Sequence, residues 1–142
     1  MQKSVQKYPH AHDLAKAIKL WGGELGFQQV GISHTRLEEE ELRLQQWLAQ
    51  GYHGEMAYMA KHGLKRSRPE ILQPGTTSII SVRMDYRPEQ LIDPWKILAD
   101  PGAAYISCYA TGRDYHKLIR KRLQKLAERI EANIGPFAYR VF

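Results

Sequence analysis

The sequence predicts an α+β domain in which helices pack against a small mixed β-sheet. Residues 78–86 and 104–109 alternate apolar and polar side chains, the two-residue period that is typical of a strand with two different faces. Residues 13–25, 37–50 and 115–134 instead repeat apolar side chains every three or four positions, as an amphipathic helix does. Helices and strands that follow one another in this order favour one sheet covered by helices.

Length and composition favour a single globular domain. The chain has 142 residues, of which 43% are hydrophobic and 25% are charged, a composition that suits one buried core and is too apolar for a disordered chain. No apolar run approaches the roughly 20 residues that cross a bilayer, and residues 1–13 lack the apolar region of a secretory signal. The single cysteine, Cys108, excludes a disulfide or a thiolate cluster within the chain. We therefore expect a cytoplasmic protein with no membrane partner.

The first part of the chain is expected to hold a flexible tail, two helices and one strand. Residues 1–9 show no periodic pattern and are interpreted as the tail. The first helix ends at Gly26, and the short alternating segment 27–32 follows it as a strand. Thr35 and Glu38 have the spacing of a capping box for the second helix, whose first turn carries four acidic residues. We interpret these carboxylates as structural, because four adjacent helical residues point in four directions.

The middle of the chain combines a segment rich in glycine and methionine with a basic loop. Residues 51–59, GYHGEMAYM, could form an adaptable wall for a flat ligand, although taken alone the two methionines are better explained as core. The basic loop that follows ends at a turn near Pro74-Gly75, before the strand at 78–86. Residues 87–102 contain three prolines and are predicted to be a mobile connection with one helical turn near 95–98.

The segment from residue 104 to residue 134 is predicted to be a strand, a short turn and a long helix. Thr111 and Asp114 have the spacing of a capping box, and Gly135-Pro136 ends the helix. A strand that leads into a helix N-terminus presents free backbone N–H groups, which suit phosphate or another anion. The side chains at this turn that could bind a ligand are Arg113, Tyr115 and His116. The residues alone favour such a site and an ordinary capped surface helix equally.

The chain is basic, which favours an acidic partner, nucleic acid first. Its formal net charge is +6 and its pI is near 9.5. Basic residues are concentrated in the last helix, where Lys117, Lys121 and Lys125 stand four residues apart. Because such a series winds around the helix and acidic residues interrupt it, the residues alone favour a solvated helix face over a phosphate-binding one.

Three segments of the sequence resemble one known family. They are ISCYATGRDYHKLIRKRL at 106–123, GYHGEMAYM with the nearby KRSRPEIL at 51–72, and SIISVRMDYRP at 78–88. In sequence, order and spacing they resemble the N-terminal part of epoxyqueuosine reductase, an oxidoreductase of tRNA queuosine biosynthesis. The resemblance covers most of residues 10–142 and implies part of a cobalamin-binding domain whose sheet is similar to that of flavin nitroreductases. It also implies that the chain is cut short before a ferredoxin-like iron–sulfur domain.

The resemblance implies an enzyme that reduces epoxyqueuosine to queuosine at the wobble position of tRNA. Cobalamin and electrons from two [4Fe–4S] clusters would serve the intact protein, which we expect to be a monomer. The family's cobalamin-contacting arginine matches Arg66 best, and His116 is expected in the pocket wall or as a hydrogen-bond partner and not as a cobalt ligand. The expected cofactor-contacting residues are Arg66, Ser107, Cys108, Tyr109, Arg113, Tyr115 and His116. The expected tRNA-contacting residues are Lys117, Lys121 and Lys125.

Two departures from the family pattern lead us to expect that this chain alone is inactive. Residues 137–142 are again strand-like and stop at Phe142 without a cap or a turn, so we expect a truncated fragment. The family's proton-donating aspartate is expected just beyond Phe142, and no catalytic residue is assigned within the chain. The cysteine runs that ligate iron–sulfur clusters are absent, so no metal site is expected in this chain. A non-catalytic RNA-binding or interaction domain is the alternative function.

Overall fold

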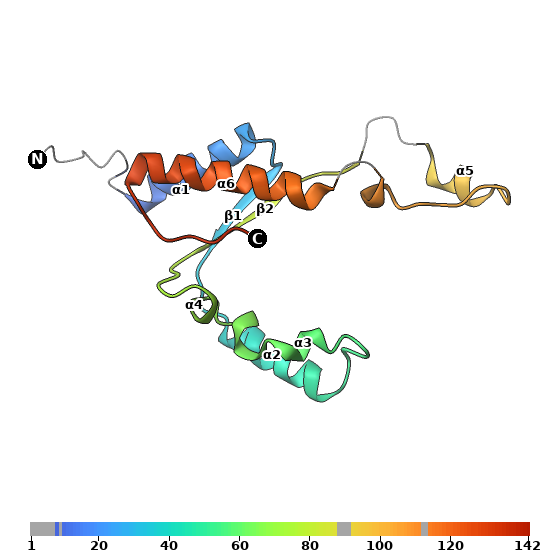
Figure 1. The fold of residues 1–142 in the computed structure, drawn as a ribbon, viewed down its shortest axis with the longest axis horizontal. Coiled ribbons are helices and arrows are strands. Elements are labelled where there is room, and N and C mark those ends of the chain that lie inside the picture. Colours follow the sequence, from blue (N-terminus) through green and yellow to red (C-terminus); the bar gives the residue numbers. More distant parts are fainter. Residues whose placement is uncertain (1–7, 9, 88–91, 112–113) are drawn as a thin grey trace, which may run out of the picture.

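The computed structural model describes residues 8, 10–87, 92–111 and 114–142, which form the α+β structure that the sequence predicts (Figure 1). The helices are α1 Ala11–Glu24, α2 Glu38–Ala49, α3 Tyr58–Lys61, α4 Pro69–Leu72, α5 Pro94–Leu98 and α6 Tyr115–Ile134. The strands are β1 Gln29–Ser33 and β2 Ile79–Arg83, and the 3₁₀ turns are η1 Gly63–Arg66 and η2 Cys108–Ala110.

The elements are arranged in three parts, which can be followed in Figure 1. The first, called the core unit here, consists of α1, α6 and the two strands. The second is the helical lobe, residues 38–72, which contains α2, α3, η1 and α4 and lies to one side of the sheet. The third is the arm, residues 92–111, which carries α5 and extends away from the start of α6.

The sheet consists of two antiparallel strands. Val30 lies opposite Val82 and Ile32 opposite Ile80, and the residues between them on each strand are exposed. This alternation places the apolar side chains on the face that α1 and α6 cover. Both strands agree with the predicted segments at 27–32 and 78–86. The sheet is nevertheless antiparallel over the described residues, and the prediction of a mixed sheet is wrong there.

The core lies between α1, α6 and the sheet. Ile18 and Trp21 of α1 pack against Leu126 and Ile130 of α6, and all four are buried. These positions are the apolar stripes that the helical periodicity predicts. The Arg129 side chain of α6 also links the two helices. It donates a hydrogen bond to Glu24 of α1 at 2.5 Å, and its guanidinium lies over the ring of Trp21.

Two segments predicted to be strands lack strand structure. Residues 104–107 are irregular and residues 108–110 form the 3₁₀ turn η2, so the predicted strand 104–109 is wrong. The segment 137–142 is irregular too. Both segments have alternating side chains, but a strand needs a partner for its backbone hydrogen bonds, and no other strand lies beside either one in the described structure.

The helices agree closely with their predicted ranges, whereas their predicted N-terminal capping boxes do not form. α2 begins at Glu38 after Leu37, and its N-cap has no side-chain hydrogen bond, so the capping box with Thr35 is wrong. Of the predicted tail only Tyr8 is described, and its ring meets Trp21 edge to face at 5.8 Å. Residues 1–7 and 9 lie outside the described structure. No helix in the described ranges is long and apolar enough to span a membrane.

Candidate functional site

The start of α6 is held by Asp114. Its carboxylate accepts a hydrogen bond from the backbone N–H of His116 at 3.0 Å and lies 3.1 Å from Nδ1 of the same residue. The side-chain contact with His116, followed by the backbone one, lowers the pKa of Asp114. Thr111 does not complete the predicted capping box, because its hydroxyl donates to the Cys108 carbonyl at 2.8 Å. The helix therefore begins with a one-residue cap and a fixed imidazole.

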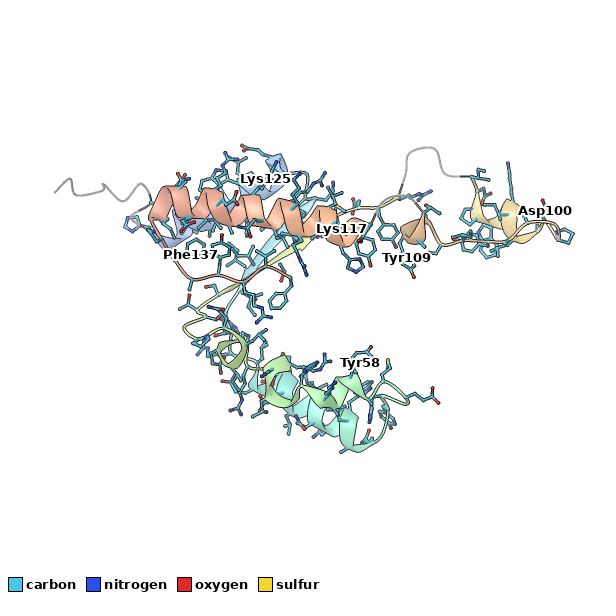
Figure 2. The ribbon with its side chains drawn as sticks, in the orientation of Figure 1. Tyr58, Asp100, Tyr109, Lys117, Lys125 and Phe137 are labelled. Atoms are coloured by element: carbon cyan, nitrogen blue, oxygen red, sulfur yellow. The ribbon has the colours of Figure 1, made fainter. Side chains whose placement is uncertain are left out.

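Three aromatic rings gather at this point. The rings of Tyr115 and His116 are stacked with centroids 4.1 Å apart, and Tyr109 meets Tyr115 edge to face at 6.5 Å. All three side chains are exposed. Figure 2 shows Tyr109 at the end of the arm next to the first turn of α6. The rings thus form one exposed aromatic cluster, called the ring surface here, against which a planar ligand could pack.

Backbone hydrogen-bonding groups lie beside these rings. Within the described structure, the N–H groups of residues 104–109 have no hydrogen-bond acceptor, whereas the Ser107 and Cys108 carbonyls accept bonds from the turn that follows. A ligand rimmed by amides or carrying an anionic group could use these free donors. The structure therefore brings together Ser107, Cys108, Tyr109, Tyr115 and His116, and their role as cofactor contacts stays a prediction.

Arg66 lies elsewhere. It belongs to η1 in the helical lobe, where it donates to the Tyr58 carbonyl at 2.7 Å and stacks over the Tyr58 ring at 5.7 Å. Figure 2 shows Tyr58 on the helical lobe, separate from Tyr109. No contact joins Arg66 to the ring surface among the described residues. Arg113 lies outside them.

A basic groove runs along the exposed face of α6. It has a volume of about 500 Å³ and is lined by Lys117, Arg120, Lys121, Gln124, Lys125 and Glu128. These residues lie on the side of the helix away from the buried Leu126 and Ile130. Figure 2 shows Lys117 and Lys125 at successive positions along α6. The structure thus places the three predicted tRNA-contacting lysines in one groove.

In the described structure, the cations of this groove lack the ion pairs that several other arginines of the chain form. Arg43, Arg68 and Arg129 each form an ion pair with a glutamate. In the described part of the chain, Arg120, Lys121 and Lys125 have no acidic partner, and Lys117 interacts only with the nearby Asp114. Unpaired cations in a row attract a polyanion.

The sequence interpretation missed Arg120, Gln124 and Tyr139. Arg120 and Gln124 are three and seven residues after Lys117, and this helical spacing could have placed them on the same face. Tyr139 follows α6 and reaches the groove because its hydroxyl accepts a hydrogen bond from Gln124 at 2.8 Å. No local pattern connects residues 124 and 139.

A second charged cluster lies in the helical lobe and is structural. Arg68 donates two hydrogen bonds to the Glu41 carboxylate, at 2.9 and 2.8 Å, and the buried Ser67 hydroxyl donates a third at 2.6 Å. The bonds from Arg68 and then Ser67 lower the pKa of Glu41 to about 2. The Arg68 and Ser67 donors of this cluster are therefore used within the lobe. No group of three or more potential metal ligands occurs in the described residues.

Comparison with known proteins finds one family model and several relatives that share a name. Residues 66–142 match the family model described as "Epoxyqueuosine reductase QueG, DUF1730". A protein of Pseudomonas aeruginosa named epoxyqueuosine reductase is 62% identical over 134 residues, which cover 94% of this chain and 37% of that protein. Proteins with the same name from Xanthomonas campestris and Escherichia coli are each 52% identical, with 94% and 92% of this chain covered and 38% and 34% of those proteins. No solved structure matches the chain significantly. The chain spans little more than a third of the length of these relatives.

Proposed function

Because the chain belongs to the family described as epoxyqueuosine reductase QueG, DUF1730, we propose that it forms the cobalamin-contacting part of an enzyme that reduces epoxyqueuosine to queuosine in tRNA. The identity of 62% with a protein named for that activity is the main support. Reduction of an epoxide to an alkene consumes two electrons and two protons and releases water. We assign neither a proton donor nor an electron carrier to the described residues.

The ring surface at the start of α6 supports cobalamin as the ligand of this region. A corrin ring is flat, apolar on its faces and rimmed by amides, so it would use exposed rings and free backbone donors together. Tyr109, Tyr115 and His116 supply the rings, and the backbone near Ser107 and Cys108 supplies the donors. His116 would act in the wall, since its Nδ1 is already engaged by Asp114. Bound cobalamin would supply the redox-active metal centre of the reaction.

Arg66 fits this ligand less directly. Its guanidinium is used by Tyr58, so a contact with the nucleotide tail of the cofactor requires that a ligand reach the helical lobe or replace the Tyr58 carbonyl. We retain Arg66 and Arg113 as proposed contacts on the strength of the family resemblance alone. The two [4Fe–4S] clusters are not assigned to this chain, because a single cysteine cannot ligate them.

The α6 groove supports tRNA as the substrate. Lys117, Lys121 and Lys125 rise by about 6 Å at each step of four residues, so together they could follow the phosphates of one strand. Arg120 adds a fourth cation on the same face. We place the protein in the cytoplasm, where tRNA is found, and expect the intact enzyme to act there as a monomer.

A chimeric enzyme tests the proposed activity. In it, the matching 134-residue region of the Pseudomonas aeruginosa reductase is replaced by this chain, and the chimera is expressed in a strain that lacks the enzyme. We expect queuosine to appear in hydrolysed tRNA, measured by mass spectrometry of the nucleosides. A soluble chimera that leaves only epoxyqueuosine would contradict the proposal.

Variants of the chimera separate the cofactor assignment from the activity. Tyr115→Ala and Arg66→Ala should weaken the binding of cob(II)alamin, and loss of one charged contact commonly costs roughly 10- to 150-fold in affinity. Leu20→Ala is the control, because Leu20 is an exposed apolar residue of α1 that belongs to no proposed site. If Tyr115→Ala and Arg66→Ala both bind cobalamin within twofold of the parent chimera, the site assignment is wrong even where the activity is restored.

A further inference from the structure

The α6 groove contains a fixed polar cluster in addition to its cations. The Gln124 amide donates to the Tyr139 hydroxyl at 2.8 Å and to a Glu128 carboxylate oxygen at 3.2 Å. Tyr139 is held in turn by Phe137, whose ring lies 5.1 Å away. Phe137 packs against the buried core, so this side of the groove is anchored to the core unit.

This cluster leaves both donors and acceptors available for a ligand. Gln124 uses its amide nitrogen in both contacts, so its carbonyl oxygen remains an unused acceptor among the described residues. The Tyr139 oxygen accepts from Gln124, which leaves its own O–H free to donate. Glu128 contributes a second carboxylate oxygen. A group that both donates and accepts hydrogen bonds would therefore find both partners here.

The neighbouring cations indicate which class of ligand would carry a group that both donates and accepts hydrogen bonds. Lys117, Arg120, Lys121 and Lys125 line the same groove and lack the neutralising pairs that other arginines of the chain have. Phosphate contacts position a nucleic acid but do not distinguish RNA from DNA, whereas the ribose 2′-hydroxyl does, and it is both donor and acceptor. An acidic protein is a poorer fit, because its carboxylates only accept and would be repelled by Glu128.

We propose that Gln124, Glu128 and Tyr139 read the 2′-hydroxyl of a strand whose phosphates lie on the cations of α6, so that the groove selects RNA over DNA. This inference rests on the proposed tRNA substrate and adds to it the feature of the substrate that is recognised. The cations supply most of the affinity, and the polar cluster supplies the preference for ribose.

The test compares two probes on the 142-residue chain. Fluorescein-labelled 12-nucleotide RNA and DNA strands of the same sequence are titrated at several salt concentrations, with fluorescence anisotropy as the measurement. We expect RNA to bind roughly 2- to 10-fold more tightly, the preference that one ordinary hydrogen bond gives. Both probes should show a steep salt dependence, because single strands contribute about 0.7 to the slope for each phosphate contact.

Variants assign the preference to the cluster. Tyr139→Phe keeps the ring and its contact with Phe137 but removes the hydroxyl, so RNA and DNA should then bind equally with an unchanged salt slope. Gln124→Ala should do the same. Lys121→Gln should reduce the slope for both probes by about 0.7 and keep the preference for RNA. Tyr52→Phe, on the segment that follows α2, is the matched control and should behave as the wild type.

Three outcomes would overturn the inference, and they do not all mean the same. Equal binding of RNA and DNA by the wild type, or a preference that persists in Tyr139→Phe, would reject the reading of the 2′-hydroxyl while leaving a nucleic-acid groove. Absence of binding to either probe would reject the groove as a tRNA contact and the inference with it. The measurement of queuosine in the chimera strain would still test the proposed activity separately.

Discussion

A single carboxylate, Glu41, joins the two ends of the helical lobe. It belongs to α2, and its partners Ser67 and Arg68 lie 26 and 27 residues later in the chain. Arg68 donates one hydrogen bond to each oxygen of the Glu41 carboxylate, and the Ser67 hydroxyl donates a third. The lobe has no fully buried apolar side chain in α2, α3 or α4, so this polar joint substitutes for a hydrophobic core.

The joint should make the stability of the chain depend on pH in the acid range. The folded-state pKa of Glu41 is about 2, below the ordinary 4.5, so the carboxylate stabilises the fold above pH 4.5 and loses that contribution as the pH falls towards 2. We expect the free energy of unfolding, measured by urea denaturation, to fall more steeply over this range in the wild type than in Glu41→Gln.

Glu39→Gln is the control for this prediction. Glu39 lies in the same turn of α2, is 81% exposed, and pairs with Arg43, which is 73% exposed, at 3.4 Å. Surface pairs of this kind contribute little, so this variant should keep the wild-type pH dependence. A Glu41→Gln profile that follows the Glu39→Gln profile would show that the joint does not contribute to stability.

At the scale of the element, α6 carries two functions on two faces. Its inner face supplies Leu126 and Ile130 to the core, and its outer face carries the cations of the groove. Leu126→Ala should lower the free energy of unfolding by about 2–5 kcal/mol, because Leu126 is buried and only 2% exposed. Leu118→Ala on the same helix should cost much less, because Leu118 is 42% exposed. Urea denaturation followed by circular dichroism measures both, and equal losses would contradict this placement of the core.

The helices could be predicted from the sequence because their signals are local. The apolar repeat of α6 and the stop at Gly135, whose φ of 91° suits glycine, lie within the segment itself. The strand predicted at 104–109 failed because alternation shows two faces but does not identify a partner strand. The caps at Thr35 and Thr111 failed because a hydroxyl at the right spacing can bond elsewhere, as Thr111 does with Cys108.

The part of the candidate site that lies close together in sequence could be predicted, and the part that depends on distant segments could not. Tyr109, Tyr115 and His116 lie close in sequence, and the structure keeps them together. Arg66 was expected to join them through the resemblance, but its position depends on the helical lobe, which no local pattern could place. Tyr139 was missed for the same reason, since its contact with Gln124 exists only after the chain has turned at the end of α6.

At the scale of the whole molecule, the arm exposes an unusual amount of apolar surface. Trp95 is 76% exposed and Ile106 is 64% exposed, and Ile92, Leu98 and Tyr109 are exposed with them. Exposed apolar side chains gathered on one segment promote association between proteins. We expect the 142-residue chain to self-associate with increasing concentration, as measured by sedimentation velocity.

Charged substitutions test whether the arm is responsible. Ile106→Lys and Trp95→Lys should reduce the self-association, because each introduces a charge into the apolar surface. Leu20→Lys is the matched control, since Leu20 of α1 is also 64% exposed but lies in the core unit. A chain that remains monomeric at every concentration, or one that responds equally to Leu20→Lys, would contradict the prediction.

The pairing of α1 with α6 has a consequence for how the chain is made. Glu24 and Arg129 are 105 residues apart, and the rest of the core joins the same two distant segments. A ribosome that adds about 5–20 residues per second needs roughly 5 to 20 seconds to reach α6 after it has completed α1. Ile18 and Trp21 have no helix to cover them during that time. Folding of the core therefore waits until α6 has been synthesised, and until then the nascent chain offers chaperones the apolar face of α1.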